Sequence, residues 1–260
     1  MTAIPLRSAQ ASRMRWRTAL GALQALLPDP DDTARAVDVI LAIGGRDFER
    51  TLRRFAASPA GRALLAEQPS LAGALSDQAA LTRMPPDSLG RAYLDYLADT
   101  GFRTTGLIDL QHETRRRWQA QHGLPPLDPV RSWFADRIGL VHDLAHVVTG
   151  YGTDDLGEAT LLAFSQGQSG GRANALLTAG AFFEVFRSRG RPWLRYVTRA
   201  YRRGRRAQSL VALPWEEMLP MRLSTVRRLA GLGQPEEAHP GGIWRGQRFH
   251  KTGRQVTESA

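Results

Sequence analysis

The sequence RIGLVHDLAHVVTGYG at residues 137–152 carries the clearest structural signal in the chain. Its apolar residues recur at helical spacing, and the run reaches Gly150, the residue type that commonly ends a helix. His142 and His146 are four residues apart, so they share one face of the predicted helix. Two imidazoles on one helical face are a common pair of metal ligands.

An acid follows at a distance that could complete this site. Thr153, Asp154 or Asp155 can cap a second helix, and Glu158 lies in the first turn of that helix. A helical hairpin of this length would bring the Glu158 carboxylate back to the histidines. The same residues have a simpler interpretation, in which Glu158 belongs to a capping box starting at Asp155 and the histidines are hydrogen-bonded core residues.

Asp143 is the fourth candidate. Adjacent residues of a helix point about 100° apart, so Asp143 could bind a metal directly or orient a ligand histidine. We predict that a divalent metal and the catalytic centre involve the same four residues, His142, Asp143, His146 and Glu158. Nitrogen and oxygen ligands favour zinc, and they also suit ferrous iron, manganese or magnesium. The chain has no cysteine, which excludes thiolate ligands, cysteine nucleophiles and disulfides.

Composition and periodicity predict an all-α, single compact helical domain that contains the metal-binding hairpin. The 260 residues are 42% hydrophobic, which is enough for one core, and strand patterns are scarce. We expect an amphipathic or flexible segment at 1–30, the helical domain at 31–232 and a flexible tail at 233–260. The predicted helices are 8–27, 31–44, 47–56, 59–67, 89–99, 109–121, 130–149, 155–166, 172–188, 192–206 and 215–230.

The charge balance predicts a partner that carries negative charge. The chain has 35 basic and 25 acidic residues, a net charge of +10. We find no motif that reads DNA or RNA, so we expect no nucleic acid partner; acidic phospholipid head groups or plain solvation fit the basic surface. No run reaches the ~18 apolar residues that span a bilayer, so we expect a soluble or peripheral protein.

Two segments are candidates for contact with a membrane or a lipid. In the first, apolar residues at helical spacing lie away from arginines, and these are Trp16, Leu20, Leu23 and Leu27 against Arg13 and Arg17. The second is the apolar run 173–186, which either packs in the core or lines a groove for a polyprenyl tail. Nearby residues that could hold lipid phosphates are Tyr201, Arg202, Arg203, Arg205 and Arg206.

The histidine motif resembles that of the coenzyme Q biosynthesis protein 4 family, which takes part in making ubiquinone. The hallmark of this family is H-D-x-x-H, eleven residues and a glutamate, and the four candidate residues match every position. Residues 84–93 look like the LP-x-x-SLG-x-x-Y segment of the family, and residues 215–227 look like its C-terminal signature. The chain departs from the family just before the histidines, where an R-x-R run is usual and only Arg137 is present.

This resemblance implies an all-helical, membrane-associated protein with a divalent metal, usually described as zinc. The substrate it implies is a polyprenylated hydroxybenzoate, from which the C1 carboxylate is removed, with or without oxidation that leaves a hydroxyl in its place. The resemblance also implies that the protein organises other ubiquinone biosynthesis enzymes, and that it forms a homodimer. We expect it in the bacterial cytoplasm at the inner membrane, or on the matrix face of the mitochondrial inner membrane in a eukaryote.

Two other functions fit parts of the motif. The first is a non-catalytic scaffold that binds a prenyl lipid and uses a structural metal, which would be closed and four-coordinate. The second is an HD-type phosphohydrolase, which would combine His142 and Asp143 with an upstream histidine such as His112 and a downstream aspartate. That class requires neither His146 nor Glu158.

Overall fold

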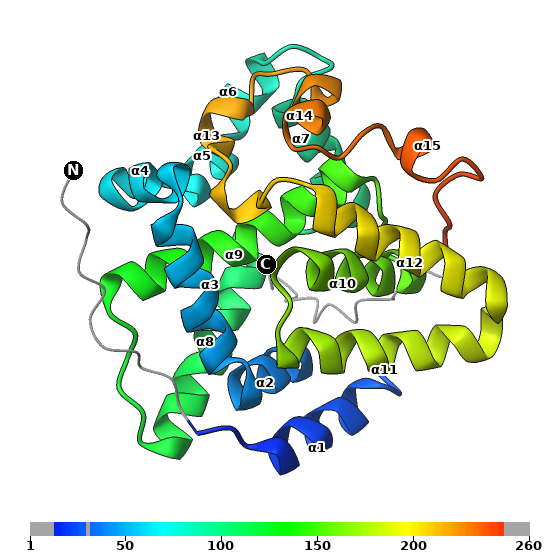
Figure 1. Cartoon of the computed structure of the whole chain (residues 1–260). Helices are drawn as coiled ribbons and strands as arrows, with labels where there is room; N and C mark the ends of the chain where they lie inside the picture. The colour runs from blue at the N-terminus through cyan, green and yellow to red at the C-terminus, as the bar shows by residue number, and fades with distance from the viewer. Residues whose placement is uncertain (1–12, 30–31, 247–260) are drawn as a thin grey trace, which may run out of the picture.

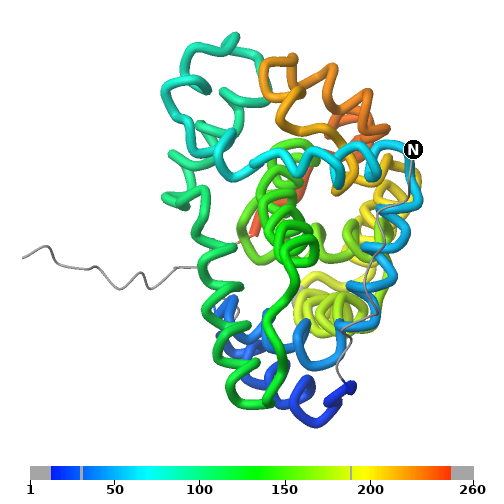
Figure 2. The backbone as a smooth tube through the Cα atoms, turned by 90° about the vertical axis from the view of Figure 1, so that its left-hand side faces the viewer, coloured from blue at the N-terminus to red at the C-terminus, as the bar shows by residue number. Residues whose placement is uncertain are grey.

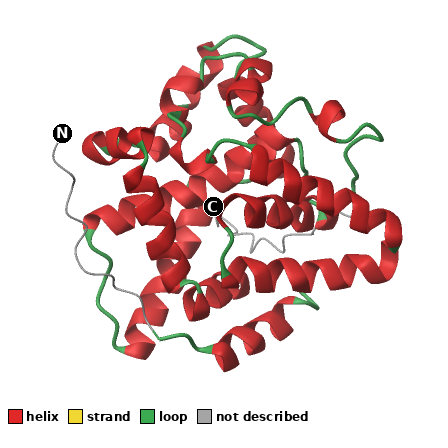
Figure 3. Cartoon of the chain, viewed as in Figure 1, coloured by secondary structure: helices red, strands yellow, loops and turns green. Residues whose placement is uncertain are grey.

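All regular structure in the described part of the chain is helical, which confirms the predicted all-α class (Figures 1 and 3). The computed structural model describes residues 13–29 and 32–246. The helices in chain order are α1 (Trp16–Leu26), α2 (Thr33–Ile43), α3 (Gly45–Ala57), α4 (Pro59–Glu67), α5 (Leu71–Ser76), α6 (Gln78–Arg83), α7 (Leu89–Thr100), α8 (Gly106–His122), α9 (Pro129–Thr149), α10 (Asp155–Ser169), α11 (Arg172–Arg189), α12 (Arg191–Arg206), the 3₁₀ helix η1 (Leu210–Ala212), α13 (Trp215–Met218), α14 (Leu223–Leu229) and α15 (Pro235–Ala238).

The helix α9, which carries both candidate histidines, lies at the centre of the fold. It packs against α7 and α8, while α10 packs against α11 and α12 (Figure 2). Its buried residues, among them Leu140, Leu144 and Val148, join a core with Tyr93 of α7 and Trp215 of α13. A helix buried on most sides has limited freedom to move, so its side chains are held in fixed positions.

The C-terminus of α9 is fixed by glycine and by two arginines from later helices. Gly150 has a φ of 82°, in the left-handed region that favours glycine. Arg227 Nε donates to the Val148 carbonyl at 3.0 Å, and Arg203 Nη1 donates to the Thr149 carbonyl at 2.8 Å. These cations satisfy carbonyl groups that a helix end leaves without partners.

The middle of α9 is held by Arg137, which is almost fully buried. Its guanidinium donates to the carbonyls of Val211 and Leu213 and forms an ion pair with Glu216, with Nη1 2.7 Å from the carboxylate. Trp215, next to this glutamate, is also fully buried. The C-terminal signature seen in the sequence therefore serves to fasten the histidine helix.

The two family-like segments outside the histidine motif, residues 84–93 and 215–227, pack against each other. The backbone N–H of Leu89 donates to the carbonyl of Met221, and that of Gly90 donates to the carbonyl of Leu219. A Cβ on Gly90 would lie 2.4 Å from the sulfur of Met84, so a larger residue here would require the Met84 side chain to move. Segments 130 residues apart in the sequence thus form one structural unit beside α9.

Some boundaries differ from the sequence predictions. The short helices α5 and α6 were not predicted, and the predicted helix 215–230 is divided into α13 and α14 at a turn that contains Pro220. Part of the stretch expected as a tail is packed, since the Trp244 ring stacks on Tyr196 with centroids 4.9 Å apart. Residues 1–12 and 247–260, which belong to the predicted terminal segments, lie outside the described residues.

None of the described helices combines the length and the apolar composition needed to cross a bilayer. The apolar face of α1 packs partly on α2, and Ala19 and Ala22 are buried there. Trp16 and Leu20 of the same helix remain 44% and 47% exposed. This helix therefore contributes both to the core and to an exposed apolar surface.

Candidate metal centre

The structure brings three of the four candidate residues together. His142 and His146 of α9 and Glu158 of α10 each offer a ligand atom, and these atoms lie within 4.8 Å of one another. The Glu158 carboxylate is 3.4 Å from His146 Nε2 and 3.8 Å from His142 Nε2. The two imidazole rings are perpendicular, with centroids 5.0 Å apart.

The turn between α9 and α10 explains how Glu158 reaches the histidines. A Cβ on Gly157 would lie 2.0 Å from the carbonyl oxygen of Gly152, so glycine is needed for α10 to start against the turn. Asp154 is the cap of this helix, and its Oδ1 accepts from the Gly157 N–H at 3.0 Å. The predicted capping role thus falls to Asp154, while Glu158, one turn further along the helix, faces the imidazoles.

The environment of His146 fixes which nitrogen faces the group. Its side chain is 2% exposed, and Nδ1 lies 3.1 Å from the carbonyl oxygen of Tyr151. A carbonyl only accepts, so Nδ1 carries a hydrogen, and in the neutral ring Nε2 keeps the lone pair that a metal between it and Glu158 would bind. Such a bond from the second nitrogen is the usual way in which a protein orients a histidine ligand.

The three donors fit a divalent cation in number, type and spacing. Two atoms bonded to one ion at about 2.1 Å and at a tetrahedral angle are about 3.4 Å apart. The separations of 3.4 and 3.8 Å between the carboxylate and the imidazoles are close to this value. The side chains of His142 and Glu158 are 35% and 32% exposed, so the group is closed on the His146 side and accessible on the other.

Asp143 is not a member of this group. Its side chain is buried, and its negative charge acts on two tyrosines of α7. Burial, followed by the charges of Asp143 and Glu158, raises the pKa of Tyr96 far above its ordinary value. Burial is also the main reason why the pKa of Tyr93 is raised to about 12. Of the two roles considered for Asp143, the geometry favours one outside the metal ligands.

Tyr96 is a candidate residue that the sequence analysis did not single out. Its ring stacks on His146, with centroids 5.9 Å apart and planes 18° from parallel. Phe102 contacts the same tyrosine edge-on, at 6.0 Å. The only sequence signal for Tyr96 is its position three residues after Tyr93, on nearly the same helical face.

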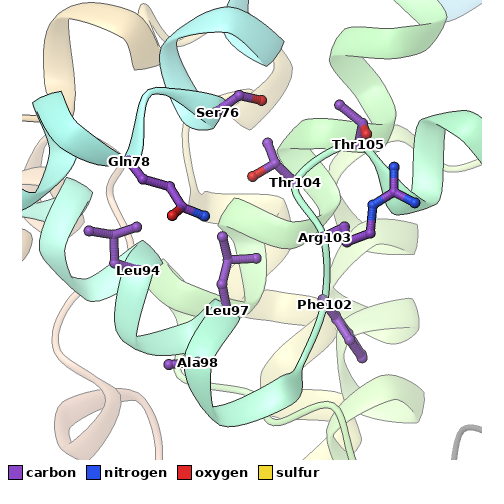
Figure 4. Close-up of a pocket in the computed structure, with 9 residues that line it drawn as sticks. All are labelled: Ser76, Gln78, Leu94, Leu97, Ala98, Phe102, Arg103, Thr104 and Thr105. Carbon is purple, nitrogen blue, oxygen red and sulfur yellow. The ribbon is translucent and has the colours of Figure 1, made fainter. Parts of the chain in front are cut away.

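A cavity of about 490 Å³ opens beyond Phe102 (Figure 4). Its walls come from the end of α5, the start of α6, the C-terminal half of α7 and the loop that follows. The apolar side chains are Leu94, Leu97, Ala98 and Phe102, and the polar ones include Gln78 and Thr104. The rings of Phe102, which lines the cavity, and Tyr96 lie between this cavity and His146.

The structure separates His112 from the histidine pair. His112 Nε2 lies 2.5 Å from the Asp136 carboxylate. Asp136 precedes His142 by six residues, or about 9 Å along a helix. Among the described residues, the group of possible metal ligands contains His142, His146 and Glu158 but not His112. The arrangement expected of an HD-type phosphohydrolase is therefore not assembled here.

The apolar run of α11 has two faces. Ala173, Leu177 and Val185 are buried, as expected of core residues, whereas Phe183 is 60% and Phe186 37% exposed. Of the residues suggested for lipid phosphates, Arg203 has to be withdrawn, because it is buried and donates to backbone carbonyls, those of Thr149 and Leu232. Tyr201, Arg202, Arg205 and Arg206 remain on the surface.

Comparison with known proteins identifies the family of this chain. The model of the family described as "Coenzyme Q (ubiquinone) biosynthesis protein Coq4" matches residues 2–122 and 125–236. The mitochondrial ubiquinone biosynthesis protein COQ4 of Paracoccidioides lutzii is 27% identical over 250 residues, covering 90% of this chain and 76% of the relative. That of Schizosaccharomyces japonicus is 29% identical over 211 residues, covering 78% and 82%.

A solved structure shows the same fold. It is the crystal structure of a Nostoc punctiforme protein assigned to ubiquinone biosynthesis, which has 19% sequence identity and a TM-score of 0.63 and covers 85% of this chain and 99% of its own. The family match spans nearly all described helices, including those that carry His142, His146 and Glu158. The chain belongs to the coenzyme Q (ubiquinone) biosynthesis protein Coq4 family.

Proposed function

We propose that this protein is a metal-dependent enzyme of ubiquinone biosynthesis that removes the C1 carboxylate of a polyprenylated hydroxybenzoate at a membrane surface. The observation that carries the proposal is the group formed by His142, His146 and Glu158, whose ligand atoms lie within 4.8 Å of one another. His142 and Glu158 are partly exposed, so a substrate oxygen can reach the group. Catalytic metal sites keep such an open position, whereas structural metal sites are closed.

The proposed metal is divalent. Zinc fits two imidazoles and a carboxylate best, and ferrous iron or manganese would accept the same ligands. When bound, such a cation would stabilise the negative charge that develops on the substrate as the carboxylate leaves. His146 would be the most rigid ligand, because it is buried and its Nδ1 is held by the Tyr151 carbonyl. Asp143 would act through α7 and not as a ligand.

The reaction breaks the bond between C1 and the carboxylate carbon. Its electron pair stays on the ring, carbon dioxide leaves, and C1 then gains a proton. In the oxidative form of the reaction, C1 gains a hydroxyl whose oxygen comes from water, and an external two-electron oxidant takes up the electron pair. Tyr96, whose ring stacks on His146 and whose hydroxyl faces the Asp143 carboxylate, would help to hold that histidine in position. The cavity beyond Phe102 would receive apolar parts of the substrate.

A membrane-facing surface is proposed at the tip of the α11–α12 hairpin and along α1. In Figure 1 the hairpin extends to one side of the molecule with α1 beneath α11. Exposed apolar side chains at these places are Trp16, Leu20, Phe183, Phe186 and Leu194. Arginines interleaved with them favour acidic head groups, as in peripheral proteins. Co-sedimentation with vesicles should weaken in Phe183→Ser and not in the exposed control Leu229→Ser.

The family resemblance extends the proposal to location and partners. We infer a peripheral protein of the bacterial inner membrane, or of the matrix face of the mitochondrial inner membrane in a eukaryote. It would act as a homodimer and would organise the other enzymes of the pathway there. A prenylated phenol or hydroxybenzoate that co-purifies with the protein would support the substrate class.

The test is complementation of a strain that lacks the corresponding gene. We expect wild type and His112→Ala to restore ubiquinone, because His112 pairs with Asp136 away from the metal group. His142→Ala and Glu158→Ala should fail and should accumulate an intermediate that still carries the C1 carboxylate. If both variants restored ubiquinone, the enzymatic role would be wrong. Metal that is bound in a closed, four-coordinate site would favour a scaffold instead.

A further inference from the structure

A second cavity lies at the N-terminal part of α12, where the chain after α15 folds back. Its volume is about 360 Å³, within the range of small-molecule sites. The residues that define its chemistry are Arg191, Arg195, Arg199, Tyr196, His239 and Trp244. None of them belongs to the metal group, so this cavity is separate from the proposed catalytic centre.

Three arginines give the cavity a concentrated positive charge. Arg191, Arg195 and Arg199 succeed each other at intervals of four residues, so their side chains share one face of α12. Within the described part of the chain, none of the three forms an ion pair, although 14 such pairs occur elsewhere. Like charges at this spacing destabilise a helix, and Arg191, the first residue of α12, also lies at the positive end of the helix dipole. A bound anion would relieve both effects.

His239 supplies a buried polar group to the same cavity. It is 1% exposed, its Nε2 lies 3.0 Å from the Tyr151 hydroxyl, and its Nδ1 has no hydrogen-bond partner. Burial is the main reason why the pKa of His239 is lowered, so the ring is neutral near pH 7 and carries one hydrogen. With the Tyr151 hydroxyl as the donor to Nε2, that hydrogen lies on Nδ1, which is then a buried donor without an acceptor.

Aromatic rings give the cavity a fixed wall. The rings of Tyr196 and Trp244 are stacked at 4.9 Å with planes 14° apart, and the Trp244 backbone N–H donates to the tyrosine hydroxyl at 3.0 Å. The Tyr196 ring also contacts His239, with centroids 4.5 Å apart. The loop after α15 is thus held against α12, so the cavity exists before any ligand arrives.

We propose that this cavity binds a phosphate group, either of a soluble phosphate compound or of a lipid head group. A phosphate monoester carries a charge of about −1.5 to −2 near neutral pH and offers three acceptor oxygens. The guanidinium groups of Arg195 and Arg199 match such oxygens with paired N–H donors. The Nδ1 hydrogen of His239 supplies a further donor from the buried side. A site of donors alone selects an anion that needs no donor in return.

The experiment measures phosphate binding by the full chain at low and at moderate salt. Inorganic phosphate is titrated by calorimetry and by Trp fluorescence, since Trp244 lies in the wall. Binding to phosphatidylcholine vesicles, with and without phosphatidic acid, is measured in parallel. The variant Arg195→Gln is compared with Arg228→Gln, an exposed arginine of α14 outside the cavity. His239→Phe removes the buried donor and keeps an aromatic ring.

We expect Arg195→Gln and His239→Phe each to weaken phosphate binding about tenfold or more, as loss of a charge-assisted hydrogen bond does. Arg228→Gln and the metal-group variant Glu158→Gln should bind as wild type, which separates this site from the proposed function. If inorganic phosphate binds and Arg195→Gln weakens that binding, the ligand is a soluble phosphate compound. If only phosphatidic acid vesicles show binding that Arg195→Gln weakens, the ligand is a lipid head group. Binding that is absent, or equally affected by Arg195→Gln and Arg228→Gln, would overturn the proposal.

Discussion

Removal of the Glu216 carboxylate tests how the histidine helix is anchored. In Glu216→Ala, the guanidinium of Arg137 loses its ion pair, although its side chain is only 1% exposed. Removing one partner of a buried ion pair costs about 3–5 kcal/mol, because the other charge stays buried. Arg137 keeps the carbonyls of Val211 and Leu213 as acceptors, which places the cost at the lower end. We therefore expect a loss of about 3 kcal/mol in the unfolding free energy.

The assay is urea unfolding, followed by circular dichroism and by Trp fluorescence. For a chain of this size, about 3 kcal/mol corresponds to a fall of roughly 6–12 °C in the melting temperature. Glu217→Ala is the matched control, since this neighbouring acid is exposed, and it should change stability by less than about 0.5 kcal/mol. Equal effects of the two substitutions would refute the claim that the C-terminal signature fastens α9.

Burial, with the charges of two neighbouring arginines, lowers the pKa of His239 from 6.5 to about 4. As the pH falls from 6.5 to 4, the imidazole of His239 is therefore protonated in the unfolded chain before it is protonated in the folded one, and the folded state loses stability. Between pH 6.5 and 4, the unfolding free energy of His239→Phe should fall less than that of wild type, by up to about 3 kcal/mol. If the unfolding free energies of the two proteins fell in parallel with pH, this prediction would be wrong. Arg227→Met removes donors from the end of α9 and should cost about 1.5–3 kcal/mol in urea unfolding, whereas the exposed Arg228→Met should have little effect. Gly157→Ala should destabilise the fold by at least about 1–3 kcal/mol, because the new Cβ meets a carbonyl oxygen. Gly21→Ala, where the new Cβ meets no atom, should stabilise it by about 0.5–1 kcal/mol. Changes in unfolding free energy of the same sign for both variants would contradict this packing.

The sequence predicted long helices well because several turns of apolar periodicity repeat the same signal. The helix expected at 130–149 is observed as Pro129–Thr149, and its end at Gly150 follows from local backbone preference. The helices α5 and α6 have six residues each, too few turns for a periodic pattern. Their start is nonetheless local, since Ser70 and Asp77 cap them.

In the candidate site too, features that depend on local geometry were predicted, and features that depend on distant contacts were not. The convergence of His142 and His146 depends on helix geometry alone, and Glu158 needs only one turn to reach them. The environment of Asp143 depends on α7, which lies about 45 residues earlier in the chain, so the spacing left its role open. The stacking of Tyr96 on His146 depends on the same packing between helices.

The packing of residues 233–246 could not be predicted from the sequence, because it also depends on distant contacts. Glycines and prolines among polar residues are typical of a mobile tail. In the structure, this stretch is fixed by contacts with residues far along the chain, as His239 meets Tyr151 and Trp244 meets Tyr196. These aromatic contacts, together with the Gly246 N–H that donates to Asp154, hold a segment whose composition suggests a mobile tail.

Metal binding by the purified chain tests the central claim most directly. We expect metal-free wild-type protein to bind one zinc ion per chain, measured by calorimetry and by elemental analysis. His112→Ala should bind equally well, since this histidine pairs with Asp136. His146→Ala should lose at least about 100-fold in affinity, because partners outside the ligand sphere already account for 10–100-fold. Equal zinc affinity in wild type and His146→Ala would contradict the account.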